Sequence, residues 1–168
     1  MTKLKLTAAA LLSAAMLIGC AHPDFVEMDT HYDTVTEKLG APSAVQVRAD
    51  GTVRALYSQQ PMGQEVYELI FDKNGKLVSK ENILKEKNFD RIEPKTMKSA
   101  DILAMYGEPC EKWTYKNLGE HTFMYRYQDQ AGFPMALWVD FDLESDEVLR
   151  YVISIDPWSQ KDGDWEAN

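Results

Sequence analysis

MKSADILAMYGEP, residues 97–109, predicts a short helix with a sharp end. Thr96 can cap its start, and four apolar side chains can share its buried side: Met97, Ile102, Leu103 and Tyr106. Gly107 and Pro109 stop the helix, because glycine is favoured just past a helix end and proline cannot continue one. This Gly-x-Pro stop is the reference point to which an earlier part of the chain can be aligned.

An earlier helical pattern ends in the same way, at Gly40 and Pro42. Asp29 or Thr30 can cap its start, and its apolar residues are spaced by four, three and four positions: Met28, Tyr32, Val35 and Leu39. This spacing lines one face of a helix. The sequence therefore predicts two short helices with the same type of ending.

The two helices belong to two copies of one unit. At one constant offset, residues of the first pattern match residues of the second: Val35, Leu39, Gly40 and Pro42 match Ile102, Tyr106, Gly107 and Pro109. The dipeptide Phe71-Asp72 likewise matches Phe141-Asp142, after slightly longer loops. The alternative is that turn chemistry alone places Gly and Pro after both helices. We interpret the pattern as a tandem repeat.

Each helix is followed by strand-like runs that short turns separate. These runs are residues 44–49, 52–58, 65–71 and 76–84 in the first unit, and 111–117, 121–128, 134–141 and 148–155 in the second. Short turns join antiparallel neighbours, so each set predicts a four-stranded meander. The predicted fold class is α+β, with repeats at residues 25–87 and 88–158 and an acidic tail at 159–168.

The helix with its stop, and the hairpin FDKNGKLV at residues 71–78, resemble the BamE (SmpA/OmlA) family of small outer-membrane lipoproteins. The resemblance implies a pair of short helices packed on a small antiparallel sheet in each repeat. A tandem copy resembles the two-unit architecture of β-lactamase inhibitor protein. The sequence departs from the family in two places. The family usually has Gly before the Met, whereas Thr96 precedes Met97 here, and the first repeat has Asp29-Thr30 in place of Gly-Met. BamE is a single unit, so its role in assembling outer-membrane β-barrels need not transfer to a double one.

The N-terminal residues resemble a bacterial lipoprotein signal. A basic start is followed by an apolar run, residues 6–18, that is shorter than the ~20 residues of a membrane span. LIGC at residues 17–20 resembles a lipobox, which implies removal of residues 1–19 and attachment of acyl chains to Cys20. An ordinary signal peptide, cut after the small residues Ala14 and Ala15, is the alternative.

Lipidation would determine where the protein works. Several acyl chains hold a protein stably in a bilayer, whereas one chain is marginal, so membrane lipid is an expected partner through acylated Cys20. Residue 21 is Ala rather than Asp, which by resemblance implies sorting to the outer membrane. We therefore expect residues 20–24 to form a short tether that holds the protein on the periplasmic face of the outer membrane.

Charge and cysteine content limit the possible partners. The formal net charge is −9, and it becomes −11 when Lys3 and Lys5 leave with the signal, so no nucleic-acid partner is expected. Cys110 would be the one thiol left after Cys20 is lipidated, and in an oxidising compartment we expect it to be buried and unreactive. Without lipidation, a Cys20–Cys110 disulfide is the alternative.

The sequence lacks the common catalytic motifs. It has no nucleophile elbow, paired-histidine metal helix, phosphate-binding loop or dinucleotide-binding glycine pattern. The spacing of His22, His31 and His121 does not indicate a metal site. The acidic run at residues 140–147 lacks the glycine and terminal glutamate of a calcium loop, so we interpret it as a solvated turn. We predict a protein that is not an enzyme, with no cofactor and no metal.

Alternation in the last two predicted strands indicates an exposed surface. One side is apolar and should face the helices: Met135, Leu137, Val139, Phe141, Leu149, Tyr151, Ile153 and Ile155. Trp138 then points the other way, near Arg150, Val152 and Arg126. Trp and Arg dominate interface energetics, so Trp138, Arg150 and Arg126 are candidate partner-binding residues.

The alternative is that this face is covered by the other repeat or by the tail, or that it holds only a contact between a cation and a ring. Tyr57 and Trp113 can extend the aromatic surface, although periodicity does not settle their side.

These patterns favour a lipid-anchored periplasmic module that binds another envelope protein. By resemblance, its process would be envelope maintenance or outer-membrane protein assembly. The tandem architecture suggests an alternative, an inhibitor of a periplasmic or secreted enzyme that presents a loop or the acidic hairpin to a cleft. A further alternative is a small enzyme or a lipid-binding carrier, and a carrier would need a deep apolar cavity.

Overall fold

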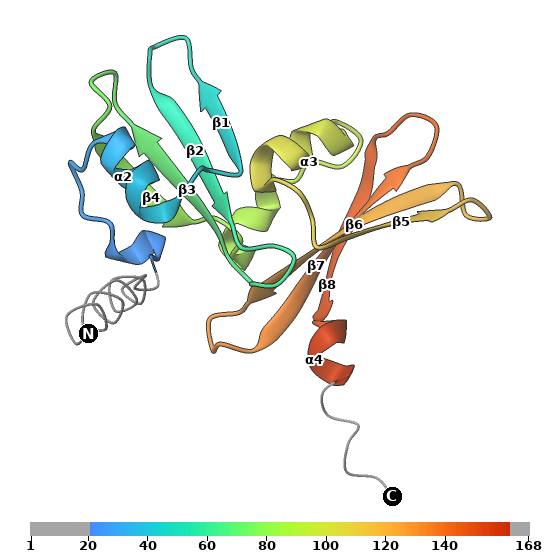
Figure 1. The fold of residues 1–168 in the computed structure, drawn as a ribbon. Coiled ribbons are helices and arrows are strands. Elements are labelled where there is room, and N and C mark those ends of the chain that lie inside the picture. Colours follow the sequence, from blue (N-terminus) through green and yellow to red (C-terminus); the bar gives the residue numbers. More distant parts are fainter. Residues whose placement is uncertain (1–20, 162–168) are drawn as a thin grey trace, which may run out of the picture.

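The computed structural model describes residues 21–161 and has an α+β fold with two four-stranded antiparallel sheets (Figure 1). The first sheet contains β1 (Ala44–Val47), β2 (Val53–Ser58), β3 (Val66–Phe71) and β4 (Leu77–Asn82). The second contains β5 (Glu111–Tyr115), β6 (Glu120–Gln128), β7 (Pro134–Asp142) and β8 (Val148–Ile155). In both sheets the strand order follows the sequence, which confirms the two predicted meanders.

Each sheet is preceded by one α-helix rather than by the helix pair that the family resemblance implies. α2 (Tyr32–Leu39) precedes the first sheet and α3 (Ser99–Tyr106) precedes the second. In place of another α-helix, a short 3-10 helix precedes each of them: η2 (Pro23–Phe25) before α2 and η3 (Glu86–Arg91) before α3. Of the described residues, no helix is both long enough and apolar enough to cross a bilayer.

Three elements lie at the predicted domain boundaries. η2 lies within the predicted tether at residues 20–24, and its Pro23 is buried. η3 spans the predicted boundary between residues 87 and 88 and places Phe89 in the core. α4 (Pro157–Lys161) follows β8 and spans the predicted boundary between residues 158 and 159. The predicted signal at residues 1–19, Cys20 and residues 162–168 lie outside the described residues.

Both α-helices begin later than predicted, because the preceding residues pair with a hairpin. In the first repeat, Asp29 N–H donates to Leu77 O (2.9 Å) and Thr30 O accepts from Leu77 N–H (2.9 Å). These bonds hold residues 29 and 30 outside the helix, so His31 caps α2 by accepting Asp33 N–H at Nδ1 (3.4 Å). Met28 is consequently exposed rather than part of the helical face.

In the second repeat, the residues before α3 form the same kind of backbone hydrogen bonds with a hairpin. Lys95 N–H donates to Val148 O (2.8 Å), and Val148 N–H donates to Met97 O (2.8 Å). Thr96 is therefore held beside the start of β8 and does not cap α3. Instead, the Asp101 carboxylate accepts Lys98 N–H (2.8 Å).

The backbone conformation at both helix stops explains why each stop has a glycine. Gly40 has φ 84° and ψ −173°, and Gly107 has φ 77° and ψ −162°. This combination of positive φ with an extended ψ is essentially restricted to glycine. Both N–H groups still close the helix, donating to Thr36 O (2.9 Å) and Leu103 O (2.8 Å). The two repeats therefore turn from helix to strand with one shared backbone conformation.

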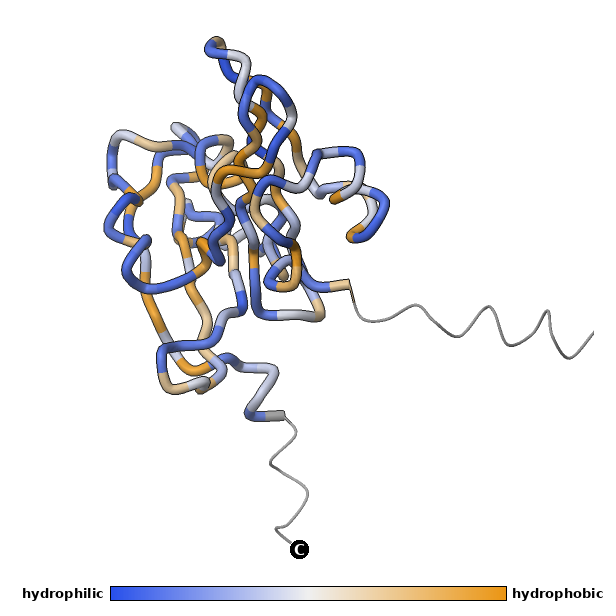
Figure 2. The backbone as a smooth tube through the Cα atoms, turned by 90° about the vertical axis from the view of Figure 1, so that its left-hand side faces the viewer, coloured by the Kyte–Doolittle hydropathy of each residue, from blue (hydrophilic) through white to orange (hydrophobic). Residues whose placement is uncertain are grey.

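The two helices cover different surfaces. α2 packs on one face of the first sheet, where Val35 joins a cluster containing Tyr57, Leu69 and Phe71. α3 lies between the two sheets (Figure 1), and its buried side chains join a single cluster with both of them: Ile102 and Tyr106 with Leu56, Val66, Tyr125 and Leu137. Figure 2 shows apolar residues along the strands and polar residues at many of the hairpin ends. The second sheet keeps one face away from α3.

An arginine of the first repeat closes the helix of the second. Arg54, on β2, donates to Ala104 O (2.6 Å) and Met105 O (2.9 Å) in the last turn of α3, and it pairs with Glu68 on β3. A cation beside a helix C-terminus is favourable because the last carbonyls carry partial negative charge. The two repeats are therefore joined by a directed polar contact as well as by the apolar cluster.

One predicted core position on β8 is displaced by a β-bulge. Asp140 pairs with Arg150 and Phe141 pairs with Val148, so Leu149 is the extra residue. Val148 takes the buried place, and Leu149 is half-exposed. The predicted side is correct for Tyr151, Ile153 and Ile155, although the last two are exposed.

We predict that Gly107→Ala lowers the free energy of unfolding by about 1–3 kcal/mol, the usual cost of a non-glycine residue in this region. The loss would come from backbone strain alone, because an added Cβ at position 107 meets no atom within 4 Å. Urea denaturation measures it, with Glu108→Ala as the control at the next position. Equal stability of the two variants would contradict the assigned helix stop.

Candidate functional site

Two tryptophans stack on the face of the second sheet that points away from α3. The ring centroids of Trp113 (β5) and Trp138 (β7) are 5.3 Å apart and their planes differ by 28°. Trp113 is opposite Thr122 and Trp138 is opposite Met124, so the two rings are diagonal neighbours across β6. Both are half-buried. The structure thus settles the side of Trp113, which the sequence left open.

Val152 extends this surface onto β8. It is paired with Trp138 and is 47% exposed. Trp138 donates its indole N–H to Ser154 Oγ (2.8 Å), which fixes the ring and leaves its carbon surface available. We call Trp113, Trp138 and Val152 the aromatic face. Tyr57 does not belong to it, because that side chain is buried in the α2 cluster.

An ionic cluster borders the aromatic face. Arg150 Nη2 lies 2.8 Å from both Glu120 Oε2 and Asp140 Oδ2, and the Arg150 side chain is 52% exposed. The hydrogen bonding that Arg150 donates to the Glu120 carboxylate is the main reason that the pKa of Arg150 rises above its usual value. Asp140 also accepts Thr122 Oγ1–H (2.7 Å). Arg150 is therefore both oriented and accessible. Together with Glu120 and Asp140 it forms a cluster with a formal net charge of −1.

Arg126 lies on the same face but is engaged within the chain. Its Nε donates to Asp156 Oδ2 (2.7 Å), and its Nη1 donates to Pro61 O (3.1 Å) and Met62 O (3.2 Å) in the β2–β3 loop. The guanidinium also lies 4.5 Å from the centroid of the Trp158 ring. Only 12% of the Arg126 side chain is exposed.

The other repeat and α4 thus cover this end of the sheet face, as the alternative interpretation proposed, while the described part of the chain leaves the end with Trp138 and Arg150 open. The sequence placed Arg126 on the correct side. It could not show that the β2–β3 loop would bind there.

Ser99, Asp146 and His121 lie together in an order that does not activate a serine. Asp146 Oδ2 accepts Ser99 Oγ–H (2.7 Å), and Asp146 Oδ1 lies 2.8 Å from His121 Nε2. A serine nucleophile needs a base that takes its proton, usually a histidine oriented by a carboxylate. Here the carboxylate lies between the two, so the cluster ties α3 to the second sheet.

The acidic hairpin between β7 and β8 is a turn held by its own backbone. Asp142 Oδ1 accepts the N–H groups of Ser145 (2.8 Å) and Glu144 (3.0 Å). The bond from Ser145 contributes most to lowering the pKa of Asp142. Within residues 21–161, no group of three or more His, Cys, Asp or Glu side chains is arranged to hold a metal ion.

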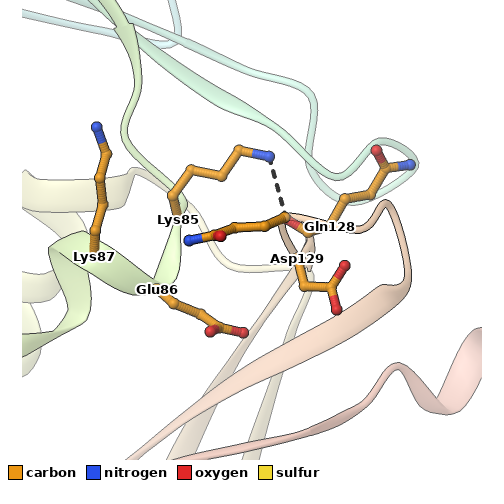
Figure 3. Close-up of a pocket in the computed structure, with 6 residues that line it drawn as sticks. Lys85, Glu86, Lys87, Gln128 and Asp129 are labelled. Atoms are coloured by element: carbon orange, nitrogen blue, oxygen red, sulfur yellow. Dashed lines mark hydrogen bonds between the residues drawn. The ribbon is translucent and has the colours of Figure 1, made fainter.

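A pocket of about 340 Å³, lined by charged and amide side chains, lies where η3 meets the end of β6 (Figure 3). Its charged groups already have partners in the chain. Lys85 Nζ donates to Gln128 O (3.2 Å), Glu86 accepts Tyr127 Oη–H (2.8 Å), and Lys87 pairs with Glu81 (2.7 Å). Groups that are already engaged by the chain are poor ligands for a small molecule. The aromatic face is therefore the stronger candidate site.

Cys110 is half-buried rather than fully buried. Its Sγ lies 3.6 Å from Pro61 O, and burial raises the pKa of the thiol to about 11. Since the thiolate is the reactive form, this environment keeps the thiol in its unreactive state at neutral pH.

We predict slow alkylation of Cys110 at pH 8, where a pKa of about 11 leaves about one thiol in a thousand ionised. Because the folded pKa is raised, the rate should increase as pH rises toward 11, and it should increase at pH 8 when the chain is unfolded in urea. Iodoacetamide labelling followed by mass spectrometry measures both rates. Equal rates for folded and unfolded protein would contradict the conclusion that partial burial suppresses ionisation of the Cys110 thiol.

We also predict that Arg126→Ala lowers stability by about 3–5 kcal/mol, because it leaves the fully buried Asp156 carboxylate without its cation. Arg150→Ala should cause a smaller loss, since half of the Arg150 side chain is in solvent. Urea denaturation of both variants measures the difference. A larger loss for Arg150→Ala would contradict the roles assigned to the two arginines.

The comparisons with known proteins do not assign a family. The chain matches no family model and no curated protein. Among solved structures, it is similar to a candidate β-lactamase inhibitor protein from Streptococcus mutans, with 11% sequence identity and a TM-score of 0.29. The match covers 74% of this chain and 82% of that one. A similarity at this level carries no argument about function.

Proposed function

We propose that this protein is a lipid-anchored periplasmic module of the outer membrane that binds another envelope protein through the aromatic face. The observation that carries the binding proposal is the stack of Trp113 on Trp138 at the open end of the second sheet. Trp and Arg are the residue types most enriched among interface residues with large binding energies. Here they are fixed in place before a partner arrives, which lowers the entropic cost of binding.

The chemistry of the aromatic face indicates the kind of partner. Its centre is apolar, whereas Glu120 and Asp140 carry one more charge than Arg150 neutralises. The whole chain is also acidic, with a formal net charge of −9. A partner that inserts an apolar side chain flanked by Lys or Arg would match both features.

The anchoring part of the proposal rests on the lipobox-like LIGC at residues 17–20. The first described residue follows Cys20 directly, and η2 begins at Pro23. Acyl chains on Cys20 would therefore hold the first repeat close to the lipid headgroups. A role in envelope maintenance or in assembling outer-membrane proteins rests on the resemblance to the BamE family alone.

Inhibition of a periplasmic or secreted enzyme is a second candidate, and two loop tips favour it. Met62, in the β2–β3 loop, is 78% exposed, and Phe133, in the corresponding β6–β7 loop, is 65% exposed. An inhibitor that enters a cleft would use such tips rather than a sheet face. The two candidates therefore place the partner on different surfaces: the aromatic face of the second sheet, or the tips of the β2–β3 and β6–β7 loops.

We predict that Trp138→Ala weakens partner capture by about 30-fold or more, the loss expected for an interface residue worth about 2 kcal/mol. The variant should remain folded, because the ring lies outside the main apolar clusters. Co-purification from detergent-solubilised membranes, quantified by mass spectrometry, measures capture. Val78→Ala is the control, because Val78 is an exposed apolar residue of the first sheet.

Normal capture by Trp138→Ala, with loss of capture by Phe133→Ala, would contradict binding at the aromatic face and favour the inhibitor. Unfolding of Trp138→Ala would show that the ring is part of the core.

A further inference from the structure

The chain is attached to the first sheet from its first described residues. His22 Nε2 lies 2.9 Å from Glu65 Oε2 and 3.2 Å from Gln59 Nε2. Asp24 Oδ2 accepts Tyr67 Oη–H (2.7 Å). These contacts tie the segment to β3 and to the β2–β3 loop, so the segment next to Cys20 is held against the protein.

A lysine of β4 strengthens this attachment. Lys80 Nζ donates to three carbonyl oxygens around η2, including Pro23 O (3.4 Å) and Val26 O (2.8 Å). An ammonium group has three donors, and here all three have partners. The position of residue 21 relative to the first sheet is therefore fixed by several independent bonds.

A pocket of about 200 Å³ lies beside Ala21. Its apolar wall consists of Pro23, Leu39, Ala41 and Tyr57, and its polar wall of Ser43, Ser58 and Gln59. Pockets for whole small-molecule ligands are usually about 300–1,000 Å³. This one is too small for a whole lipid but suits the polar-to-apolar junction of one, such as an ester-linked glyceryl group.

The Tyr57 side chain that lines this pocket has a hydroxyl without a hydrogen-bond partner among the described residues. The residue is only 9% exposed, and burial raises the pKa of its hydroxyl to about 12, so the group remains a proton donor. Nearly all buried hydroxyls in folded proteins have a partner, so this one lacks the acceptor that such a group usually has. Ester and amide carbonyls are such acceptors.

We infer that this pocket seats the glyceryl ester portion of lipid-modified Cys20, with Tyr57 Oη–H donating to one of its carbonyl oxygens. The inference rests on the proposed lipidation. Cys20 is bonded to Ala21, which lines the pocket, and the bonds of His22, Asp24 and Lys80 hold the segment that follows Ala21. The acyl chains then leave the pocket toward the bilayer, and the first repeat meets the membrane with its α2 side in a set orientation.

Photo-cross-linking of the lipidated protein in lipid nanodiscs tests this seating. A diazirine amino acid is placed at position 41, an exposed alanine that lines the pocket, and in a second variant at position 49, an exposed alanine in the β1–β2 turn. After irradiation and proteolysis, mass spectrometry locates the adduct. We expect position 41 to link to the lipid moiety of Cys20 and position 49 not to.

Tyr57→Phe keeps the ring and removes the donor, so it should lower the yield of this adduct while the melting temperature stays close to that of the unchanged protein. Adducts at position 41 with bulk phospholipid alone, or with no lipid, would overturn the inference. An unchanged yield in Tyr57→Phe would overturn the role of the hydroxyl. The intact mass of the same sample reports lipidation separately, so an unmodified Cys20 would contradict the proposed function itself.

Discussion

The packing of α3 between the two sheets is the constraint on which the rest of the structure depends. α3 has only 8 residues, and its Ile102 and Tyr106 belong to one apolar cluster with Leu56 and Val66 of the first repeat. Arg54 reinforces the arrangement by binding the last carbonyls of α3. Because α3 occupies one face of the second sheet, residues 21–161 cover the other face where the β2–β3 loop and α4 reach it, and the aromatic face is the part that these residues leave open.

Local signals in the sequence were sufficient for α2, α3, the eight strands and their order. A Gly-x-Pro stop depends on the backbone of a few residues, and strand alternation depends on one sheet face. The helix starts could not be predicted in this way, because residues 29–30 and 95–97 form hydrogen bonds with strands that lie about fifty residues away. The bulge at Leu149 has the same origin, since it depends on the pairing of β7 with β8 rather than on local composition.

In the candidate site, too, local patterns predicted some features, whereas contacts between distant residues determined others. Alternation placed Trp138, Arg150 and Arg126 on one side of the sheet, where the structure also has them. It could not place Trp113, whose position depends on the register across β6, nor show that Arg126 is used to hold Asp156 and the β2–β3 loop. The interpretation of cellular location has a different basis, because it comes from residues 1–20 and not from the fold.

Hydroxyl-radical footprinting of the protein with its co-purified envelope partner tests the central claim most directly, because tryptophan side chains report their own exposure to solvent. The proposed function predicts that oxidation of Trp113 and Trp138 falls in the complex, while Met62 and Phe133 at the loop tips stay reactive. Protection of Met62 and Phe133 with unchanged oxidation of the two tryptophans would contradict the claim.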